Sequence, residues 1–273
     1  MMPRRILYAL ALAGSAAAQT FIQMSDPQFG MFTSNQSFEH ETVNLEFAIA
    51  NANRLKPAFV IITGDLINDA GNAAQASEYK RITAKLDASI KLFHVAGNHD
   101  VGNEATKESL ARYRERNGPD YYSFRVGDIA GIVLNSNLEK GTKNVADEAA
   151  KMEVWFKSEL AKAKGAKHIL VFQHIPFFKK EADEAEVYDN IPPDVRERYL
   201  KRMREAGVKY IFAGHLHYSL EARDGDLQVI GTGPVGKPLG KGKSGFRIVA
   251  VTPDALKHQY FEFGEIPETL DVK

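Results

Sequence analysis

Cysteine is absent from this sequence of 273 residues. Disulfide bonds and thiolate metal sites are therefore excluded, and any bound metal must be held by nitrogen and oxygen ligands. The chain also lacks net charge, because 35 basic residues balance 35 acidic ones. A general nucleic-acid-binding surface requires an excess of basic residues, so we expect none here.

Apolar runs long enough to span a bilayer as a helix are missing too. The run at residues 6–13 is too short for this purpose. It follows Arg4 and Arg5 and precedes the small residues 16–18, which is the pattern of an export signal with its cleavage site. We expect residues 1–18 to be a signal peptide and the protein to be secreted or periplasmic, with no transmembrane segment in the mature chain. The alternative is a cytoplasmic protein in which these residues form an ordinary first helix or strand.

The remaining composition is that of one globular domain. Hydrophobic residues make up 44% of the chain and charged residues 26%, values that exclude disordered and fibrous classes. No internal repeat, low-complexity tract or linker divides the sequence. We therefore expect a single domain over residues 19–273, and the sequence leaves its oligomeric state open.

Buried-strand patterns and helical patterns alternate along the first half of the chain. Strands are predicted at 20–26, 58–63 and 92–96, with helices at 39–54 and 76–88 between them. Such alternation predicts a parallel sheet whose strand ends meet at one edge. Further elements are predicted as a helix at 108–116, a hairpin over 121–136, a helix at 147–164, a strand at 168–173, a helix ending near 206, a strand at 208–213 and three strands after residue 226. The hairpin introduces antiparallel pairing, which favours a second sheet.

Five of the predicted strands end in oxygen or nitrogen donors. The residues at these ends are Asp26 with Gln28, Asp65, Asn98 with His99 and Asp100, His174, and His215 with His217. Such donors suit manganese, iron, zinc or magnesium. A single Asp or His is more often a cap or a packed polar residue, but five separate strand ends would not acquire this set by accident. The other histidines, His40, His94, His168 and His258, lack this placement and are interpreted as structural or surface residues.

Together these segments resemble the five motifs of the calcineurin-like metallophosphoesterases. The motifs D-x-[HQ], GD, GNHD, H and GHxH occur here in that order as Asp26-Pro27-Gln28, Gly64-Asp65, Gly97-Asn98-His99-Asp100, His174 and Gly214-His215-Leu216-His217. The segments DPQFG and GNHDVGN are similar to one branch, the calcineurin-like phosphoesterase domain-containing proteins. That branch is described as acting on phosphoserine and phosphothreonine in proteins.

The resemblance implies an α/β fold, a four-layer α-β-β-α sandwich with two mixed β-sheets and a metal centre at the carboxyl ends of strands. It implies two divalent metal ions, whose identity stays open among Mn, Fe, Zn and Mg. The implied ligands are Asp26, Gln28, Asp65 and His217 for one ion, and Asp65, Asn98, His174 and His215 for the other. Three residues would have catalytic roles, namely His99 as general acid, Asp100 as the carboxylate that orients its imidazole, and Asn98 as a group that neutralises phosphoryl charge.

Two positions depart from the family pattern. Gln28 stands where most of the superfamily has His, and a neutral amide oxygen is a weaker donor than imidazole, so we expect the first metal to be held more weakly. Asn68 stands where the purple acid phosphatases have Tyr, so we expect no purple colour.

The resulting prediction is a metal-dependent phosphomonoesterase in which a hydroxide activated by two metal ions attacks phosphorus and His99 protonates the leaving group. The substrate would be a phosphoserine or phosphothreonine protein, or a small phosphate ester, which export favours. A phosphodiesterase acting on a cyclic nucleotide or lipid headgroup is the alternative, because surrounding loops select the substrate. A non-enzymatic metal-binding module is the third possibility.

Two loops are predicted to lie near the site. One contains Lys179 and Lys180, and the other, at 231–245, contains Lys237, Lys241 and Lys243. For these lysines we favour a solvated surface over a role in substrate binding.

Overall fold

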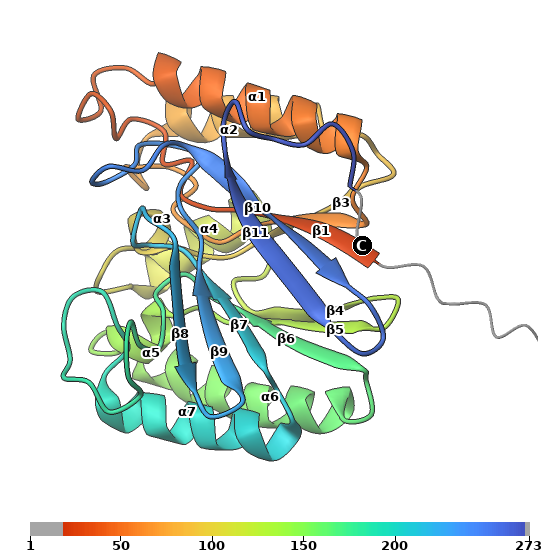
Figure 1. The fold of residues 1–273 in the computed structure, drawn as a ribbon. Coiled ribbons are helices and arrows are strands. Elements are labelled where there is room, and N and C mark those ends of the chain that lie inside the picture. Colours follow the sequence, from red (N-terminus) through yellow and green to blue (C-terminus); the bar gives the residue numbers. More distant parts are fainter. Residues whose placement is uncertain (1–18, 271–273) are drawn as a thin grey trace, which may run out of the picture.

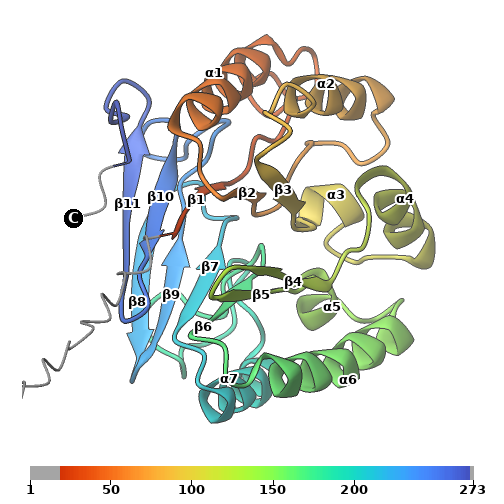
Figure 2. The same ribbon diagram turned by 90° about the vertical axis from the view of Figure 1, so that its right-hand side faces the viewer.

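The computed structural model describes residues 19–270. Two mixed β-sheets lie face to face, and helices cover the outer face of each (Figures 1 and 2). Helices α1 (Glu39–Leu55) and α2 (Ala73–Thr83) cover one sheet, and α6 (Ala146–Ala163) and α7 (Pro193–Ala206) cover the other. This arrangement confirms the predicted four-layer α-β-β-α sandwich. The predicted signal peptide, residues 1–18, lies outside the described residues.

The first sheet holds the three parallel strands that were predicted from the amino-terminal half. Its strands, in spatial order, are β11 (Leu256–Glu262), β10 (Gly245–Val251), β1 (Gln19–Met24), β2 (Phe59–Ile62) and β3 (Lys91–His94). Strands β1, β2 and β3 pair in parallel, whereas β10 and β11 are antiparallel to their neighbours. The strand β1 thus joins the first βαβ units to the carboxyl-terminal hairpin.

The second sheet has a parallel centre and an antiparallel strand at each edge. Its spatial order is β4 (Tyr122–Val126), β5 (Ile129–Val133), β6 (His168–Phe172), β7 (Tyr210–Ala213), β9 (Leu227–Gly231) and β8 (Leu220–Asp224). The predicted hairpin is confirmed as the pair β4 and β5. The sequence analysis missed β8, because its segment LEARD is largely polar and lies on the sheet edge, where no apolar pattern is required.

The remaining helices lie in the connections that follow β3 and β5. They are α3 (Asn98–Val101), α4 (Lys107–Asn117) and α5 (Asn137–Lys140). Helix α2 begins earlier than the predicted 76–88, because the Asn72 side chain accepts hydrogen bonds from the backbone of Ala74 and Gln75 and so caps the helix. It also ends earlier, at Thr83. Within residues 19–270 we find no helix whose length and hydrophobicity would allow it to cross a membrane.

The space between the two sheets is filled by aromatic side chains. Phe21 and Phe59 of the first sheet stack with ring centroids 4.6 Å apart, and Phe172 and Phe212 of the second stack at 5.3 Å. Phe21 meets Phe212 edge-on at 5.4 Å across the gap. Neighbouring residues along each strand alternate sides, so Ile22 packs under the helices instead. This double burial explains the continuous apolar runs in the sequence.

The buried face of α1 leaves out two of its apolar residues. Val43 is 65% exposed and Phe47 is 44% exposed, so the apolar residues of this segment do not by themselves indicate which face packs on the sheet. The helix packs on the sheet through a different stripe of residues, Leu45, Ala48, Ile49 and Ala52. Small alanines on this stripe allow close approach to the sheet, while Phe47 packs edge-on against Phe263 of the carboxyl-terminal segment.

Candidate metal centre

The predicted ligands meet at one edge of the sandwich, where five parallel strands end. Strands β1, β2 and β3 of the first sheet and β6 and β7 of the second deliver them. The residues that follow these strands are, in order, Asp26 and Gln28, Asp65, Asn98, His174, and His215 and His217. All are buried, with exposed fractions of 8% or less. The sequence expectation that they gather at the carboxyl ends of the strands is confirmed.

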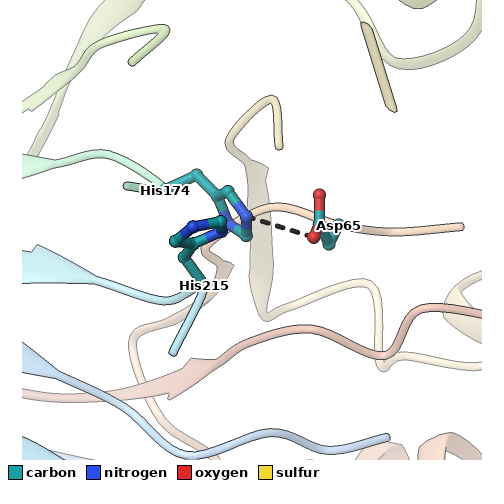
Figure 3. A group of neighbouring side chains, drawn as sticks. All are labelled: Asp65, His174 and His215. Carbon is teal, nitrogen blue, oxygen red and sulfur yellow. Dashed lines mark ion pairs between the residues drawn. The ribbon is translucent and has the colours of Figure 1, made fainter. Parts of the chain in front are cut away.

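Two overlapping groups within this set could each hold a metal ion. Asp65, His174 and His215 form one group (Figure 3), and Asp26, Asp65 and His217 form the other. In each group, one ligand atom of every residue lies within 4.8 Å of the others. Nε2 of His174 is 3.2 Å from Oδ2 of Asp65, and Nε2 of His217 is 3.4 Å from Oδ1 of Asp26. Asp65 belongs to both groups and is therefore placed to bridge two ions.

Gln28 and Asn98 extend the two groups with amide oxygens. The Gln28 amide donates to Oδ1 of Asn68 at 3.1 Å, which leaves its own Oε1 buried with no hydrogen-bond partner among residues 19–270. Oδ1 of Asn98 lies 3.1 Å from Nε2 of His174. Oδ1 of Asp26 and Nε2 of His215 are likewise buried and have no hydrogen-bond partner in the described part of the chain. Buried polar atoms normally have a partner, so this cluster of acceptors fits divalent cations.

Two of the imidazoles have a defined tautomer. Nδ1 of His174 lies 2.7 Å from the carbonyl oxygen of Thr63, and Nδ1 of His217 lies 2.6 Å from that of Lys237. A carbonyl oxygen can only accept, so each Nδ1 carries the proton and donates it. When these rings are neutral, as metal binding requires, the lone pair of Nε2 therefore faces the site, which is the arrangement that metal-binding histidines adopt.

The backbone of the ligands is strained. Positive φ angles occur at Asp26 (48°), Gln28 (39°), Asp65 (49°), His215 (70°) and His217 (56°). This region is costly for residues other than glycine and is found at functional sites where the surrounding structure enforces it. Backbone hydrogen bonds from Asp26 to Gly64 and from Gln28 to Asp65, at 3.1 and 2.9 Å, hold the first two loops together.

Glycines in the motifs allow these loops to pack closely. A Cβ atom at Gly97 would collide with the backbone nitrogen of Asp65, and one at Gly214 would collide with the hydroxyl of Ser25. Both glycines therefore serve the close approach of neighbouring ligand loops. This requirement explains the glycines of the GNHD and GHxH motifs.

Charges within the site favour a bound cation. Burial opposes ionisation of Asp65, but the charge and hydrogen bond of His174 outweigh it and hold the pKa of the carboxyl below its ordinary value. Burial likewise opposes protonation of His174, yet Asp65 and Asp26 raise its pKa to about 9. Burial and the neighbouring His174 lower the pKa of His215 to about 3, so this imidazole is neutral and able to ligate. The negative charge of the carboxylates would thus stabilise a bound metal ion.

The structure corrects the predicted partner of His99. Its Nδ1 lies 2.9 Å from the carbonyl oxygen of Asn68 and donates to it, so Asp100 does not orient this ring. The Asp100 carboxylate instead accepts hydrogen bonds from the backbone of Leu66, Ile67 and Gly97. Asp100 therefore ties the loop after β2 to the loop after β3. Its carboxylate faces inward because α3 turns adjacent side chains to different sides.

The two predicted loops do lie at the site, and one contributes a residue that the sequence analysis missed. In the loop 231–245, the Gly236 backbone donates to the carbonyl of Asp26, and the carbonyl of Lys237 accepts from His217. In the other loop, Lys179 pairs with Asp189 at 2.9 Å. The missed residue is Tyr188, whose hydroxyl lies 3.1 Å from Nδ2 of Asn98. No sequence pattern distinguishes this tyrosine, because it lies in an irregular acidic segment.

Comparison with known proteins agrees with this geometry. The family model described as calcineurin-like phosphoesterase matches residues 20–219. The chain is 32% identical over 265 residues to the serine/threonine-protein phosphatase CPPED1 of Bos taurus, covering 91% of this chain and 85% of that protein. It is 31% identical over 266 residues to the human protein of the same name, again covering 91% and 85%.

Solved structures show the same fold at low sequence identity. A dimetal phosphatase from Danio rerio superposes with a TM-score of 0.66 at 17% identity, covering 89% of this chain and 95% of that chain. GAP50 of Plasmodium superposes with a TM-score of 0.65 at 15% identity, covering 90% and 85%. With its motifs gathered at one sheet edge and the family model matching most of its length, the chain belongs to the calcineurin-like phosphoesterase family.

Proposed function

We propose that this protein hydrolyses phosphomonoesters with the help of two divalent cations. The observation that carries the proposal is the pair of buried ligand groups that share Asp65. One cation would be held by Asp26, Gln28, Asp65 and His217, and the other by Asp65, Asn98, His174 and His215. When bound, such ions supply the Lewis acidity that activates water and neutralises charge on phosphoryl oxygens. Nitrogen and oxygen donors of this kind suit manganese, iron, zinc or magnesium.

His99 is proposed to protonate the leaving oxygen. Its Nδ1 is occupied by the carbonyl of Asn68, so Nε2 is the ring position left to hold and transfer a proton. The His99 side chain is half-buried, whereas the metal ligands are buried, and it is therefore the imidazole of the site that a substrate can reach. General-acid catalysis of this kind contributes roughly a hundredfold to ten-thousandfold in rate. Asp100 would act as a positioning residue, because its carboxylate joins two ligand loops.

A monoester is favoured over a diester by the relatives. CPPED1 proteins are named serine/threonine-protein phosphatases, and the similarity spans nearly the whole of this chain. A probable cyclic nucleotide phosphodiesterase of Rhodococcus erythropolis is 28% identical over 63% of this chain, which keeps the diester as the second candidate. If residues 1–18 direct export, as their sequence predicts, a small phosphate ester is the favoured monoester.

The test compares matched substrates. Chelator-stripped protein is assayed with and without added Mn²⁺ on p-nitrophenyl phosphate, bis-p-nitrophenyl phosphate and a phosphoserine peptide. We expect metal to restore activity, with the monoester preferred over the diester. The Asp65→Asn variant should lose activity in the presence of metal, because both ligand groups share this carboxylate. Metal-restored activity confined to the diester would contradict the proposal.

The role of His99 is tested separately with leaving groups of different basicity. His99→Gln should reduce turnover strongly on an alkyl phosphate and only weakly on p-nitrophenyl phosphate, whose leaving group needs no proton. His168→Gln, at the amino-terminal end of β6 and thus away from the carboxyl ends of the strands, serves as the matched control. Equal losses of the His99 variant on both esters would remove the general-acid role.

A further inference from the structure

Tyr188 lies directly beside the metal centre. Its ring centroid is 5.1 Å from that of His215, and its hydroxyl is 3.1 Å from Nδ2 of Asn98. The side chain is nevertheless 55% exposed. One edge of the phenol therefore faces two proposed ligands, while the rest faces the solvent from which a substrate arrives.

The loop that carries Tyr188 is fixed in place by two cationic side chains, those of Arg196, which is buried, and Lys140, which is half-buried. Arg196, with no exposed surface, donates to the carbonyl oxygens of Ala182, Glu184 and Ile191 at 2.8 to 3.1 Å. The Lys140 ammonium donates to the carbonyls on either side of Tyr188, those of Val187 at 2.8 Å and Asn190 at 2.7 Å. These hydrogen bonds thus hold the loop, and with it the phenol, in a defined position.

The contacts of the Tyr188 hydroxyl leave its proton available for a hydrogen bond to a ligand. Nδ2 of Asn98 can only donate, so the phenol oxygen accepts from it. Among the described residues, the recorded acceptor for the phenol proton is Oδ1 of Asn103 at 3.4 Å, which is long for such a bond. A phosphoryl oxygen, being charged, is a much stronger acceptor and would readily displace this contact.

Polar neighbours of Tyr188 in the loop are already occupied. The Lys179 ammonium pairs with Asp189 at 2.9 Å, and the Asp189 carboxylate lies 3.9 Å from Nε2 of His215. Glu184 accepts from the backbone of Lys179 and from the Asn190 amide. Tyr188 is the residue of this loop whose hydroxyl contacts the proposed ligand Asn98, which places it as a donor to an anion at the metal centre.

We propose that the Tyr188 hydroxyl donates a hydrogen bond to a phosphoryl oxygen of the substrate, next to the Asn98 amide. The inference rests on the proposed function, since it assumes that a phosphate group binds at the metal centre. It adds a substrate-contacting residue from outside the five motifs. The hydrogen bond also fixes the Asn98 amide, so that Oδ1 faces His174 and Nδ2 faces the phenol.

The experiment measures binding of inorganic phosphate to Mn²⁺-loaded protein by calorimetry. In Tyr188→Phe, we expect phosphate affinity and kcat/KM on p-nitrophenyl phosphate to fall about 10- to 100-fold, the usual range for a hydrogen bond to a charged group. The Mn²⁺ content should match the wild type. Tyr121→Phe, which alters a phenol that packs against Trp155, is the matched control and should retain wild-type values.

The outcomes separate the two proposals. Unchanged phosphate affinity in Tyr188→Phe, with an active wild type, would overturn the role of Tyr188 and leave the proposed function standing. Loss of Mn²⁺ from the variant would also overturn it, since Tyr188 would then act only through the ligand Asn98. A wild type that binds Mn²⁺ but neither binds phosphate nor hydrolyses any phosphoester would overturn both proposals.

Discussion

Gln28 is the residue at which we expect the affinity of the first metal site to be set. Its Oε1 is buried with no hydrogen-bond partner among residues 19–270, while its amide nitrogen donates to Asn68. The unpaired oxygen is therefore available to bind a metal ion. A neutral amide oxygen nevertheless binds late transition metals less tightly than an imidazole nitrogen does.

Replacing Gln28 by His should therefore strengthen the first metal site. We expect Gln28→His to retain more Mn²⁺ or Zn²⁺ after dialysis and to bind the ion more tightly in calorimetric titration. Gln259→His, on the exposed face of β11, is the control and should match the wild type. Unaltered metal content and affinity in Gln28→His would argue that position 28 does not touch the metal.

His94 makes folding stability depend on pH. Its Nε2 is buried with no partner among the described residues, and burial, aided by the charge of Lys80, lowers its pKa to about 4. As pH falls below 6.5, the unfolded chain takes up a proton at His94 that the folded protein does not. The stability that His94 provides as a neutral residue is therefore lost as pH falls from 6.5 toward 4.

The expected effect is measurable by urea unfolding at several pH values. Between pH 7.5 and 5, His94 should contribute a loss of about 2 kcal/mol in unfolding free energy, a loss that His94→Gln should lack. His40→Gln, at an exposed position of α1, should keep the wild-type pH dependence. Parallel pH curves for the wild type and His94→Gln would refute this account.

At the level of elements, the loop at 179–190 depends on the helix that follows it. Helix α7 presents Arg196 to the segment before it, and the guanidinium donates to the carbonyl oxygens of Ala182, Glu184 and Ile191. Burial lowers the pKa of Arg196, although its acidic neighbours oppose this effect. The loop at 179–190 is thus held by side-chain hydrogen bonds rather than by regular secondary structure.

Removing these hydrogen bonds should loosen the loop. We expect Arg196→Met to lower the free energy of unfolding by about 1 to 3 kcal/mol, because buried carbonyls lose their donors. Trypsin should also cleave at Lys179 and Lys180 faster than in the wild type. Arg198→Met, which removes a partly exposed ion pair with Asp194, is the control and should change neither property much. An unchanged cleavage rate would show that the loop is held by other contacts.

At the scale of the whole molecule, the metal centre joins the two sheets. Its ligands follow β1, β2 and β3 in one sheet and β6 and β7 in the other, so a bound ion would link both halves of the sandwich. A ligand that binds only the folded state stabilises it by mass action, by about 2.7 kcal/mol at a hundred times its dissociation constant.

Thermal unfolding should therefore respond to metal. We expect EDTA to lower the unfolding midpoint of the wild type and Mn²⁺ to restore it. Asp65→Asn should show little response to either addition, because both ligand groups lose their shared carboxylate. Asp254→Asn, at an exposed position beyond β10, should behave like the wild type. Equal responses of wild type and Asp65→Asn would place the stabilising metal elsewhere.

The sequence by itself determined the candidate ligand set and, through the resemblance of its motifs to those of the calcineurin-like metallophosphoesterases, the four-layer fold. Strand ends carry the candidate ligands, and the order of Asp26, Asp65, His174 and His215 along the chain follows the order in which parallel strands are added. Alternation of buried strands with helices also predicted a parallel sheet and the edge at which these residues gather. The sheet and its edge depend on local periodicity and on residues adjacent to an element, both of which a single sequence contains.

Only the tertiary structure decided the contacts between distant segments. The carbonyl of Asn68 replaces Asp100 as the partner of His99, and Tyr188 reaches Asn98 from a loop 90 residues away in the sequence. The buried face of α1 and the strained backbone of Asp26 likewise follow from what packs against them. Such features arise because the packed sheets bring together groups whose separation along the chain bears no relation to their separation in space.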